Sequence, residues 1–259
     1  MEARLLLQHL TGRTASALIA HPEQPLDTAT HTAYRALISR RAAGEPIAYL
    51  TGQREFYGRD FSVAPGVLIP RPETELLVEL GLAKMAHIAT PRLLDLGCGS
   101  GCIAISLALE RPAACVHALD ASPAALAIAR QNAMALGASL KLMESHWFSA
   151  LTPERESEHY HLIVANPPYI AANDPHLQQG DLRFEPASAL ASGTDGLDDI
   201  REIIATARHH LQPGGWLLFE HGYDQAPAAH ALLNATGYKN IEQHRDLAGI
   251  TRISGGTWG

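Results

Sequence analysis

Residues 92–101 read Arg-Leu-Leu-Asp-Leu-Gly-Cys-Gly-Ser-Gly, an apolar run that passes directly into a glycine-rich loop. Gly97, Gly99 and Gly101 follow the spacing G-x-G-x-G, and glycines at such a turn let the backbone bend sharply and approach a ligand closely. Dinucleotide sites begin in the same way, but their fingerprint places the third glycine where this chain has Cys102. The stretch therefore predicts a buried strand followed by a loop that binds a ligand other than a dinucleotide.

Two acidic residues near predicted strand ends narrow the choice of ligand. Asp95 would place a negative charge near the phosphates of a dinucleotide, whereas it suits a ligand with a positive centre and an ammonium group, and S-adenosylmethionine has both. Asp120 ends the next predicted strand, 23 residues after Gly97, where a carboxylate can accept both ribose hydroxyls of an adenosine. The alternative for Asp120 is a plain acidic residue at the start of the helix that follows Ser122.

The chain after residue 72 alternates strands and helices. We predict strands at 92–97, 115–120, 139–144, 161–166, 214–222, 240–244 and 249–254, and helices at 103–111, 122–137, 197–211 and 225–236. Such alternation is typical of an α/β fold with a doubly wound, mostly parallel sheet, here of seven strands. Residues 1–50 show helical spacing alone and predict a small helical domain, and residues 51–72 predict a β-hairpin connector.

Asn166-Pro167-Pro168-Tyr169 follows the strand predicted at 161–166. Two prolines fix two φ angles and remove two backbone donors, so the turn is stiff. The side-chain oxygen of Asn166 and the carbonyl of Pro167 can accept the two N–H bonds of a planar NH2 group, and Tyr169 can lie flat against it. A proline-rich turn that merely ends a strand is the structural alternative.

These motifs resemble the class I, S-adenosylmethionine-dependent amino methyltransferases. IPRPETE at 69–75, HWF at 146–148 and DPHLQQGDLRFEP at 174–186 bring the resemblance closer to the protein-glutamine methyltransferases that modify peptide chain release factors. The resemblance covers essentially the whole chain and implies a Rossmann-like sheet. It also implies methyl transfer from S-adenosylmethionine to N5 of the glutamine in a Gly-Gly-Gln motif.

The resemblance also implies which residues form the site. Residues implied to bind the cofactor are Gly97, Cys98, Gly99, Ser100, Gly101, Asp120, Trp147 and Asn166. Asn166, Pro167, Pro168 and Tyr169 are implied to hold the substrate glutamine, with Asn166, Pro167 and Tyr169 as the catalytic set. The chain departs from the family at His146, where an acidic residue is usual, and its closing GGTWG matches no family motif.

Cysteine and histidine usage predicts no metal site. Cys98 and Cys102 are four residues apart, but no second Cys/His pair lies nearby, and the fourteen histidines are scattered. We expect both cysteines to fill small spaces in the loop and the helix. Three cysteines are also too few for a disulfide framework, which favours the reducing cytoplasm.

Charge and composition limit the partners. Of the 259 residues 46% are hydrophobic, no apolar run approaches the ~18 residues of a membrane span, and the N-terminus lacks the regions of a signal peptide. Eight basic against six acidic residues give 1–72 a charge of +2, and twelve against 21 give 73–259 a charge of −9. An acidic larger part disfavours a nucleic-acid substrate.

Three other functions fit the sequence less well. An adenine-N6 DNA methyltransferase uses the same Asn-Pro-Pro-Tyr logic, but it usually carries a basic recognition domain. A binding module without activity would not need an intact turn at 166–169, and a nicotinamide oxidoreductase would lack a hydride-transfer set here. We expect the catalytic domain to span 73–259, and residues 1–50 to recognise the substrate protein.

Overall fold

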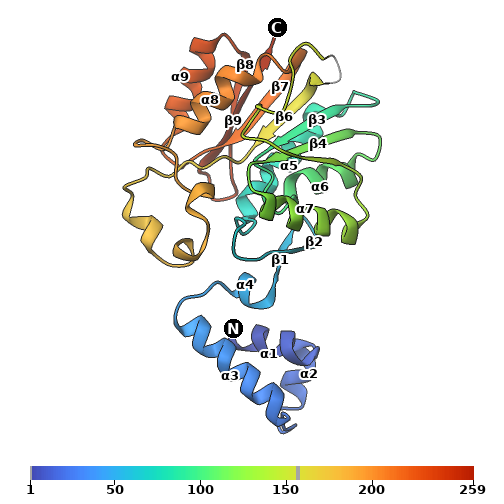
Figure 1. Cartoon of the computed structure of the whole chain (residues 1–259), viewed down its shortest axis with the longest axis vertical. Helices are drawn as coiled ribbons and strands as arrows, with labels where there is room; N and C mark the ends of the chain where they lie inside the picture. The colour runs from blue at the N-terminus through green and yellow to red at the C-terminus, as the bar shows by residue number, and fades with distance from the viewer. Residues whose placement is uncertain (1, 156–157) are drawn as a thin grey trace.

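The computed structural model describes residues 2–155 and 158–259 and shows two parts (Figure 1). A small helical part stands apart from a larger α/β part, and α4 with a β-hairpin joins the two. The N-terminal elements are α1 Glu2–Thr11, α2 Ala15–Ala20, α3 Thr28–Ala42, α4 Ile47–Thr51, β1 Gln53–Phe56 and β2 Arg59–Ser62. Their helical character follows from local signals, since Thr14 and Asp27 cap α2 and α3 with side-chain oxygens.

The larger part holds the seven-stranded sheet. Its helices are α5 Glu75–Lys84, α6 Cys102–Glu110, α7 Pro123–Leu136, α8 Asp198–Ala207 and α9 Ala226–Thr236. Its strands are β3 Arg92–Leu96, β4 Cys115–Asp120, β5 Lys141–Glu144, β6 Tyr160–Ala165, β7 Leu211–Glu220, β8 Lys239–Arg245 and β9 Thr251–Trp258. Short 3-10 turns lie at η1 Pro72–Thr74, η3 Pro175–Gln178, η4 Leu182–Phe184 and η5 Ala187–Ala189.

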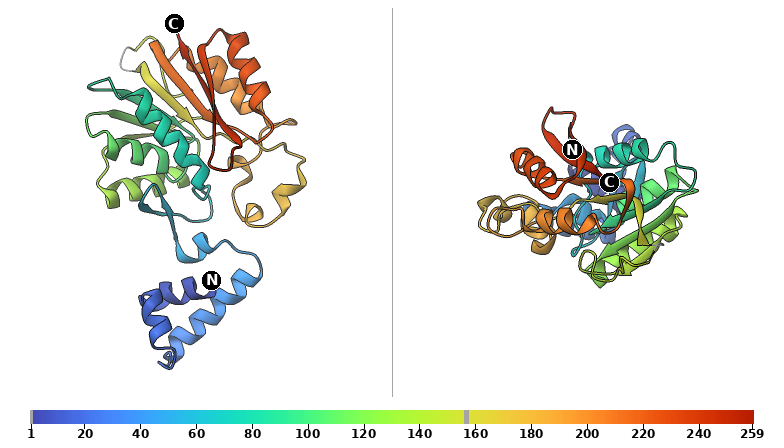
Figure 2. Two further views of the ribbon diagram at one scale, coloured as in Figure 1. Left: turned by 180° about the vertical axis from the view of Figure 1, so that it is seen from behind. Right: turned by 90° about the horizontal axis from the view of Figure 1, so that it is seen from above.

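The sheet order is β5-β4-β3-β6-β7-β9-β8, with only β9 antiparallel to its neighbours β7 and β8. Helices α5, α6 and α7 cover one face, and α8 and α9 cover the other (Figure 2). A hydrophobic core lies on each face of the sheet, and successive strand residues point to opposite cores. Leu162 packs into the core under α5, α6 and α7, and Ile163 packs into the core under α8 and α9. The prediction of a doubly wound, mostly parallel sheet is confirmed.

The order of the strands places a crevice between β3 and β6. The chain runs from β3 out to β4 and β5 and then returns to β6 on the other side of β3, so the strand order reverses between these two strands. Ligands of open α/β sheets bind at such a reversal, beyond the carboxyl ends of the strands. The Leu96–Ala165 and Ala165–Phe219 pairs bring the residues that follow β3, β6 and the end of β7 to one level.

The hairpin packs into the larger part. Phe56 and Phe61 are fully buried in the core that α5, α6 and α7 cover. Asn132 of α7 accepts the N–H of Ser62 at 2.8 Å and donates to the carbonyls of Ser62 and Ser100. The connector is therefore tied both to α7 and to the glycine loop after β3.

Predicted boundaries in the C-terminal third were wrong by up to four residues. The helix predicted to reach residue 211 ends at Ala207, because Leu211 pairs with Tyr160 and already belongs to β7. The last strand runs on to Trp258 and so includes most of the closing GGTWG. A Cβ at Gly255 would lie 2.2 Å from the carbonyl oxygen of Leu217, which explains a glycine at that position. In the described part of the chain, no helix is long and apolar enough to cross a membrane.

Candidate active site

Asp120 fixes the glycine loop to the start of α7. Its Oδ2 accepts the N–H of Gly99 and its Oδ1 accepts the N–H of Ser122, each at 2.8 Å. Gly99 has a φ of +54°, which a residue with a side chain rarely adopts. Burial raises the pKa of Asp120, and the two backbone donors oppose that rise. The carboxylate of Asp120, at the end of β4, therefore holds the glycine loop in its conformation.

Trp147 lies across the glycine loop. Its backbone φ is +46°, uncommon for a bulky residue, and its ring lies so close to Gly97 that a Cβ there would be 3.3 Å from Cζ3. Its Nε1 donates to Oδ1 of Asp199 at 3.1 Å, at the first turn of α8. His146 beside it is exposed, with Nδ1 3.7 Å from Glu202. A backbone turn and a hydrogen bond therefore hold the indole in place.

A larger cavity of about 450 Å³ lies between the glycine loop and the Asn-Pro-Pro-Tyr turn. Its lining includes the predicted site residues Gly97, Gly99, Asp120, Trp147, Asn166 and Pro168. Cys98, Ser100 and Gly101 are not among the lining residues: the side chains of Cys98 and Ser100 are buried, and Gly101 is the N-cap that precedes α6. The burial expected for Cys98 and Cys102 is therefore seen, while a cofactor contact by Cys98, Ser100 or Gly101 stays a prediction.

A smaller cavity of about 50 Å³ lies on the other side of the turn. Its lining residues are Leu68, Arg71, Asn166, Pro167, Tyr169, Ile170, Leu182, Ala189 and Leu190. Pro167 and Tyr169 face this cavity, and Pro168 faces the larger one. Asn166 lines both cavities, so its side chain stands where contents of the two would meet.

Behind Asn166 lies a buried polar chain. Nδ2 of Asn166 donates to Oγ1 of Thr74 at 3.2 Å, and Oγ1 of Thr74 donates to Oε2 of Glu220 at 2.7 Å. The hydroxyl of Tyr169 donates to Oε1 of the same carboxylate at 3.2 Å. Thr74 and Glu220 are each only 2% exposed. Neither was predicted from the sequence, although Thr74 lies inside the IPRPETE motif and Glu220 is an acid at a strand end, as Asp120 is.

Asp95 does not reach the larger cavity. It is fully buried, and burial raises the pKa of its carboxyl to about 8. Its Oδ2 accepts the N–H of Ala104 at 3.1 Å, and its Oδ1 has no hydrogen-bond partner among the described residues. The suggestion that Asp95 meets an ammonium group therefore finds no support in the lining of this cavity.

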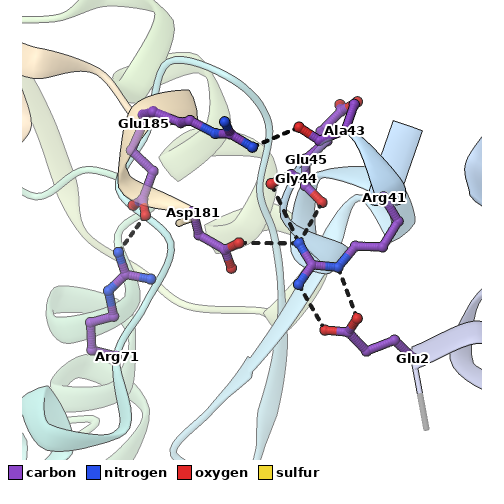
Figure 3. A network of polar contacts seen from close by, with 9 residues as sticks. Glu2, Arg41, Ala43, Gly44, Glu45, Arg71, Asp181 and Glu185 are labelled. Atoms are coloured by element: carbon purple, nitrogen blue, oxygen red, sulfur yellow. Dashed lines mark hydrogen bonds and ion pairs between the residues drawn. The ribbon is translucent and has the colours of Figure 1, made fainter. Parts of the chain in front are cut away.

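The segment after the turn is pinned to the N-terminal part by polar contacts (Figure 3). Glu185, whose side chain is fully buried, pairs with Arg71 and accepts the N–H of Ile69 at 3.0 Å. Arg41 of α3 contacts Asp181 at 3.2 Å and also pairs with Glu2 at 2.9 Å. The segment that walls the smaller cavity is thus held from both the connector and the helical domain.

Two domain families match the chain: the PrmC N-terminal domain at residues 1–52 and the methyltransferase small domain at residues 72–193. The chain is 53% identical to the release factor glutamine methyltransferase of Burkholderia pseudomallei, over 99% of this chain and 91% of that protein. It is 52% identical to the enzyme of the same name from Bordetella pertussis, over 99% and 94%. The chain belongs to the release factor glutamine methyltransferase family.

Solved structures of other methyltransferases have the same fold as this chain. A methyltransferase from Pyrococcus furiosus aligns with a TM-score of 0.58 at 16% identity, over 87% of this chain and 98% of that one. The hMettl16 catalytic domain aligns with a TM-score of 0.61 at 14% identity, over 92% and 94%. At these identities the likeness shows the methyltransferase fold alone. The resemblance inferred from the motifs, with its Rossmann-like sheet, is confirmed.

Proposed function

We propose that the protein transfers a methyl group from S-adenosylmethionine to the side-chain amide nitrogen, N5, of the glutamine in the Gly-Gly-Gln motif of peptide chain release factors. The position of Asn166, on the wall shared by the two cavities, is the observation that carries the proposal. Methyl transfer needs donor and acceptor on opposite sides of one point, and the shared wall provides that point. The names of the family members at 53% and 52% identity support the same reaction.

The larger cavity fits S-adenosylmethionine. Its volume lies within the roughly 300–1,000 Å³ typical of small-molecule sites. Gly97 and Gly99 leave the floor open to close backbone approach, Trp147 offers an aromatic face, and Asp120 and Asp199 add carboxylates that suit a cationic ligand. Bound there, S-adenosylmethionine would supply an activated methyl group on a sulfonium. No predicted cofactor contact depends on a metal.

The smaller cavity fits the acceptor. Pro167 and Tyr169 give it a stiff rim, and Oδ1 of Asn166 with the Pro167 carbonyl would accept the two N–H bonds of the glutamine amide. Positive charge develops on that nitrogen during transfer, so both acceptors bind the transition state more tightly than the ground state. A metal ion would oppose this charge, and we therefore propose a metal-free reaction in which water takes the released proton.

The helical N-terminal domain is proposed to bind the body of the release factor. A tripeptide offers little surface, whereas stable interfaces bury roughly 1,200–2,000 Å². The charge of +2 on residues 1–72 against −9 on the rest gives this part a different face, and Arg41 links it to the segment at Asp181. We propose a cytoplasmic protein with no nucleic-acid or membrane partner. An adenine-N6 DNA methyltransferase is not favoured, because the relatives at 53% and 52% identity are named as release factor glutamine methyltransferases.

The test compares Asn166→Ala and Asn166→Asp with the wild-type protein, using labelled S-adenosylmethionine and a purified release factor. Losing one preorganised partner of a developing charge costs about 10²–10³ in rate. Asn234→Ala, at an exposed position on α9, is the matched control. Mass spectrometry locates the added methyl. Wild-type rates in either Asn166 variant, or a methyl on another residue, would contradict the proposal.

A further inference from the structure

The amide of Asn166 can act as an acceptor only if its oxygen, and not its nitrogen, is turned toward the substrate. An asparagine side chain is nearly symmetric in shape, so packing alone does not choose between the two orientations. The choice must come from a hydrogen-bond partner on the far side of the amide. In this structure that partner is Thr74, whose Oγ1 lies 3.2 Å from Nδ2 of Asn166.

A hydroxyl can accept a hydrogen bond from the amide nitrogen or donate one to the amide oxygen, so Thr74 alone would not select either end of the amide. It does not stand alone, because Oε2 of Glu220 lies 2.7 Å from the same oxygen. When Glu220 is ionised, its carboxylate can only accept, and it then takes the single proton of the hydroxyl. Thr74 is left as an acceptor toward Asn166, which must then present its N–H.

The same carboxylate also fixes the aromatic side of the smaller cavity. Oε1 of Glu220 accepts the hydroxyl of Tyr169 at 3.2 Å. The buried carboxylate of Glu220 thus orients Tyr169 directly and Asn166 indirectly, through Thr74. Asn166 and Tyr169 both line the smaller cavity. Among residues 2–155 and 158–259, no group donates a hydrogen bond to Oδ1 of Asn166, so that oxygen remains available to the acceptor.

We infer that Thr74 and Glu220 are positioning residues that set the orientation of the Asn166 amide and so present its Oδ1 to the acceptor nitrogen. The inference rests on the proposed function for the chemistry that this oxygen performs. It adds two residues that line neither of the two cavities. Their place explains why a carboxylate is buried at the end of β7, on the row that Asp120 and Asn166 share.

Three variants test the inference. Thr74→Val keeps the shape and removes the hydroxyl, Thr74→Ser restores the hydroxyl, and Glu220→Gln keeps the shape but adds a donor. We expect Thr74→Val and Glu220→Gln to lower kcat by about tenfold to hundredfold, the scale of a misplaced catalytic group. KM for the release factor and the Kd for S-adenosylmethionine should change by less than about threefold. Thr74→Ser should recover most of the wild-type kcat.

A second readout needs no substrate. In protein labelled with ¹⁵N asparagine, the side-chain N–H₂ signal of Asn166, assigned from its loss in Asn166→Asp, reports the bond to Thr74. We expect this signal to shift and its exchange with water to quicken in Thr74→Val, and to remain near wild type in Thr74→Ser. An unchanged signal in Thr74→Val, or equal kcat in Thr74→Val and Thr74→Ser, would overturn the inference. Failure of the wild-type protein to methylate a release factor would instead overturn the proposed function, and the signal would still decide the positioning.

Discussion

Trp147 donates a hydrogen bond from Nε1 to Oδ1 of Asp199 at 3.1 Å, joining the turn after β5 to the first turn of α8. Besides that bond, the indole is held by its backbone turn, by contact with Gly97 and by packing against the core under α8 and α9. Both residues line the larger cavity. The position of this aromatic wall therefore depends on a residue 52 positions away in the sequence.

We expect Asp199→Ala to weaken S-adenosylmethionine binding roughly threefold to tenfold, because a net hydrogen bond contributes about 0.5–1.5 kcal/mol. Asp198→Ala is the matched control: it removes the same charge from the same helix end, but Asp198 pairs with Arg201 instead. Isothermal calorimetry on the two variants measures the difference. Equal dissociation constants for the two variants would mean that Trp147 needs no support from α8.

Asp120→Ala should weaken S-adenosylmethionine binding at least about tenfold, because it removes a charged acceptor from Gly99 and Ser122, and hydrogen bonds to charged groups contribute about 1.5–3 kcal/mol. Asp120→Asn keeps one acceptor and should fall between. Glu144→Ala is the control, since Glu144 pairs with Asp120 in the sheet register but is exposed and outside the cavity lining. Calorimetry again gives the affinities. Unchanged affinity in Asp120→Ala would remove Asp120 from the site.

The sequence predicted the parts of the site that follow from strand ends. The resemblance implied that the glycine loop, Asp120 and Asn166 bind one cofactor. The larger cavity brings them together, because the residues after successive parallel strands meet at one edge of the sheet. The helical spacing of residues 1–50 also predicted a helical N-terminal domain. These features depend on periodicity and local turn chemistry, both of which are visible in one sequence.

The partners that act across the fold were not predictable in that way. Thr74 and Glu220 are 146 residues apart in the sequence, and their hydrogen bond joins η1 to the end of β7. The positive φ of Trp147 depends on the contacts of its ring and not on a glycine or a proline signal. The closing GGTWG had no motif to match, yet Gly255 is required by the carbonyl of Leu217 on the neighbouring strand. Tertiary contacts determine all three.

Arg41→Ala should lower kcat/KM on an intact release factor roughly threefold to tenfold, while turnover of a short Gly-Gly-Gln peptide stays within about twofold of wild type. Arg41 contacts Asp181 and so joins α3 to the segment beside the smaller cavity (Figure 3). Exposed ion pairs contribute only about 0.2–1 kcal/mol each, so the effect on folding should be small. The larger effect is expected on the relative placement of two surfaces that bind one partner.

Arg40→Ala is the control for that measurement, because Arg40 is the adjacent residue of α3 and pairs with Glu45 within the N-terminal part. A truncation is less informative, since deleting the hairpin would also remove Phe56 and Phe61 from the main core. Steady-state kinetics on both substrates decide the point. If Arg40→Ala and Arg41→Ala behave alike, or if the peptide is affected as much as the protein, the N-terminal domain does not bind the release factor through this contact.

Glu220 should make the folded protein less stable as the pH rises from acid toward neutral. Burial raises the pKa of its carboxyl from 4.5 to about 7; Thr74, Tyr169 and the charge of Arg252 oppose the rise, while Glu73 adds to it. Between these two values the folded chain holds a proton that the unfolded chain has lost, so the free energy of unfolding falls as pH increases. At about 1.4 kcal/mol per unit the full loss is roughly 3 kcal/mol, complete above the folded-state pKa.

Glu220→Gln carries no titrating group at this position and should lack that part of the pH dependence. Urea unfolding of the wild type and the variant at about pH 5 and about pH 8 measures it, because titrating groups that do not interact with Glu220 contribute equally to both proteins and cancel in the comparison. We expect the wild type to lose roughly 2–3 kcal/mol more than the variant between the two conditions. The same loss in both proteins would show that Glu220 titrates near its ordinary pKa, with the carboxylate already ionised in weakly acidic solution. Glu220 would then accept the hydroxyl of Thr74 as an ionised carboxylate over the whole range of the measurement.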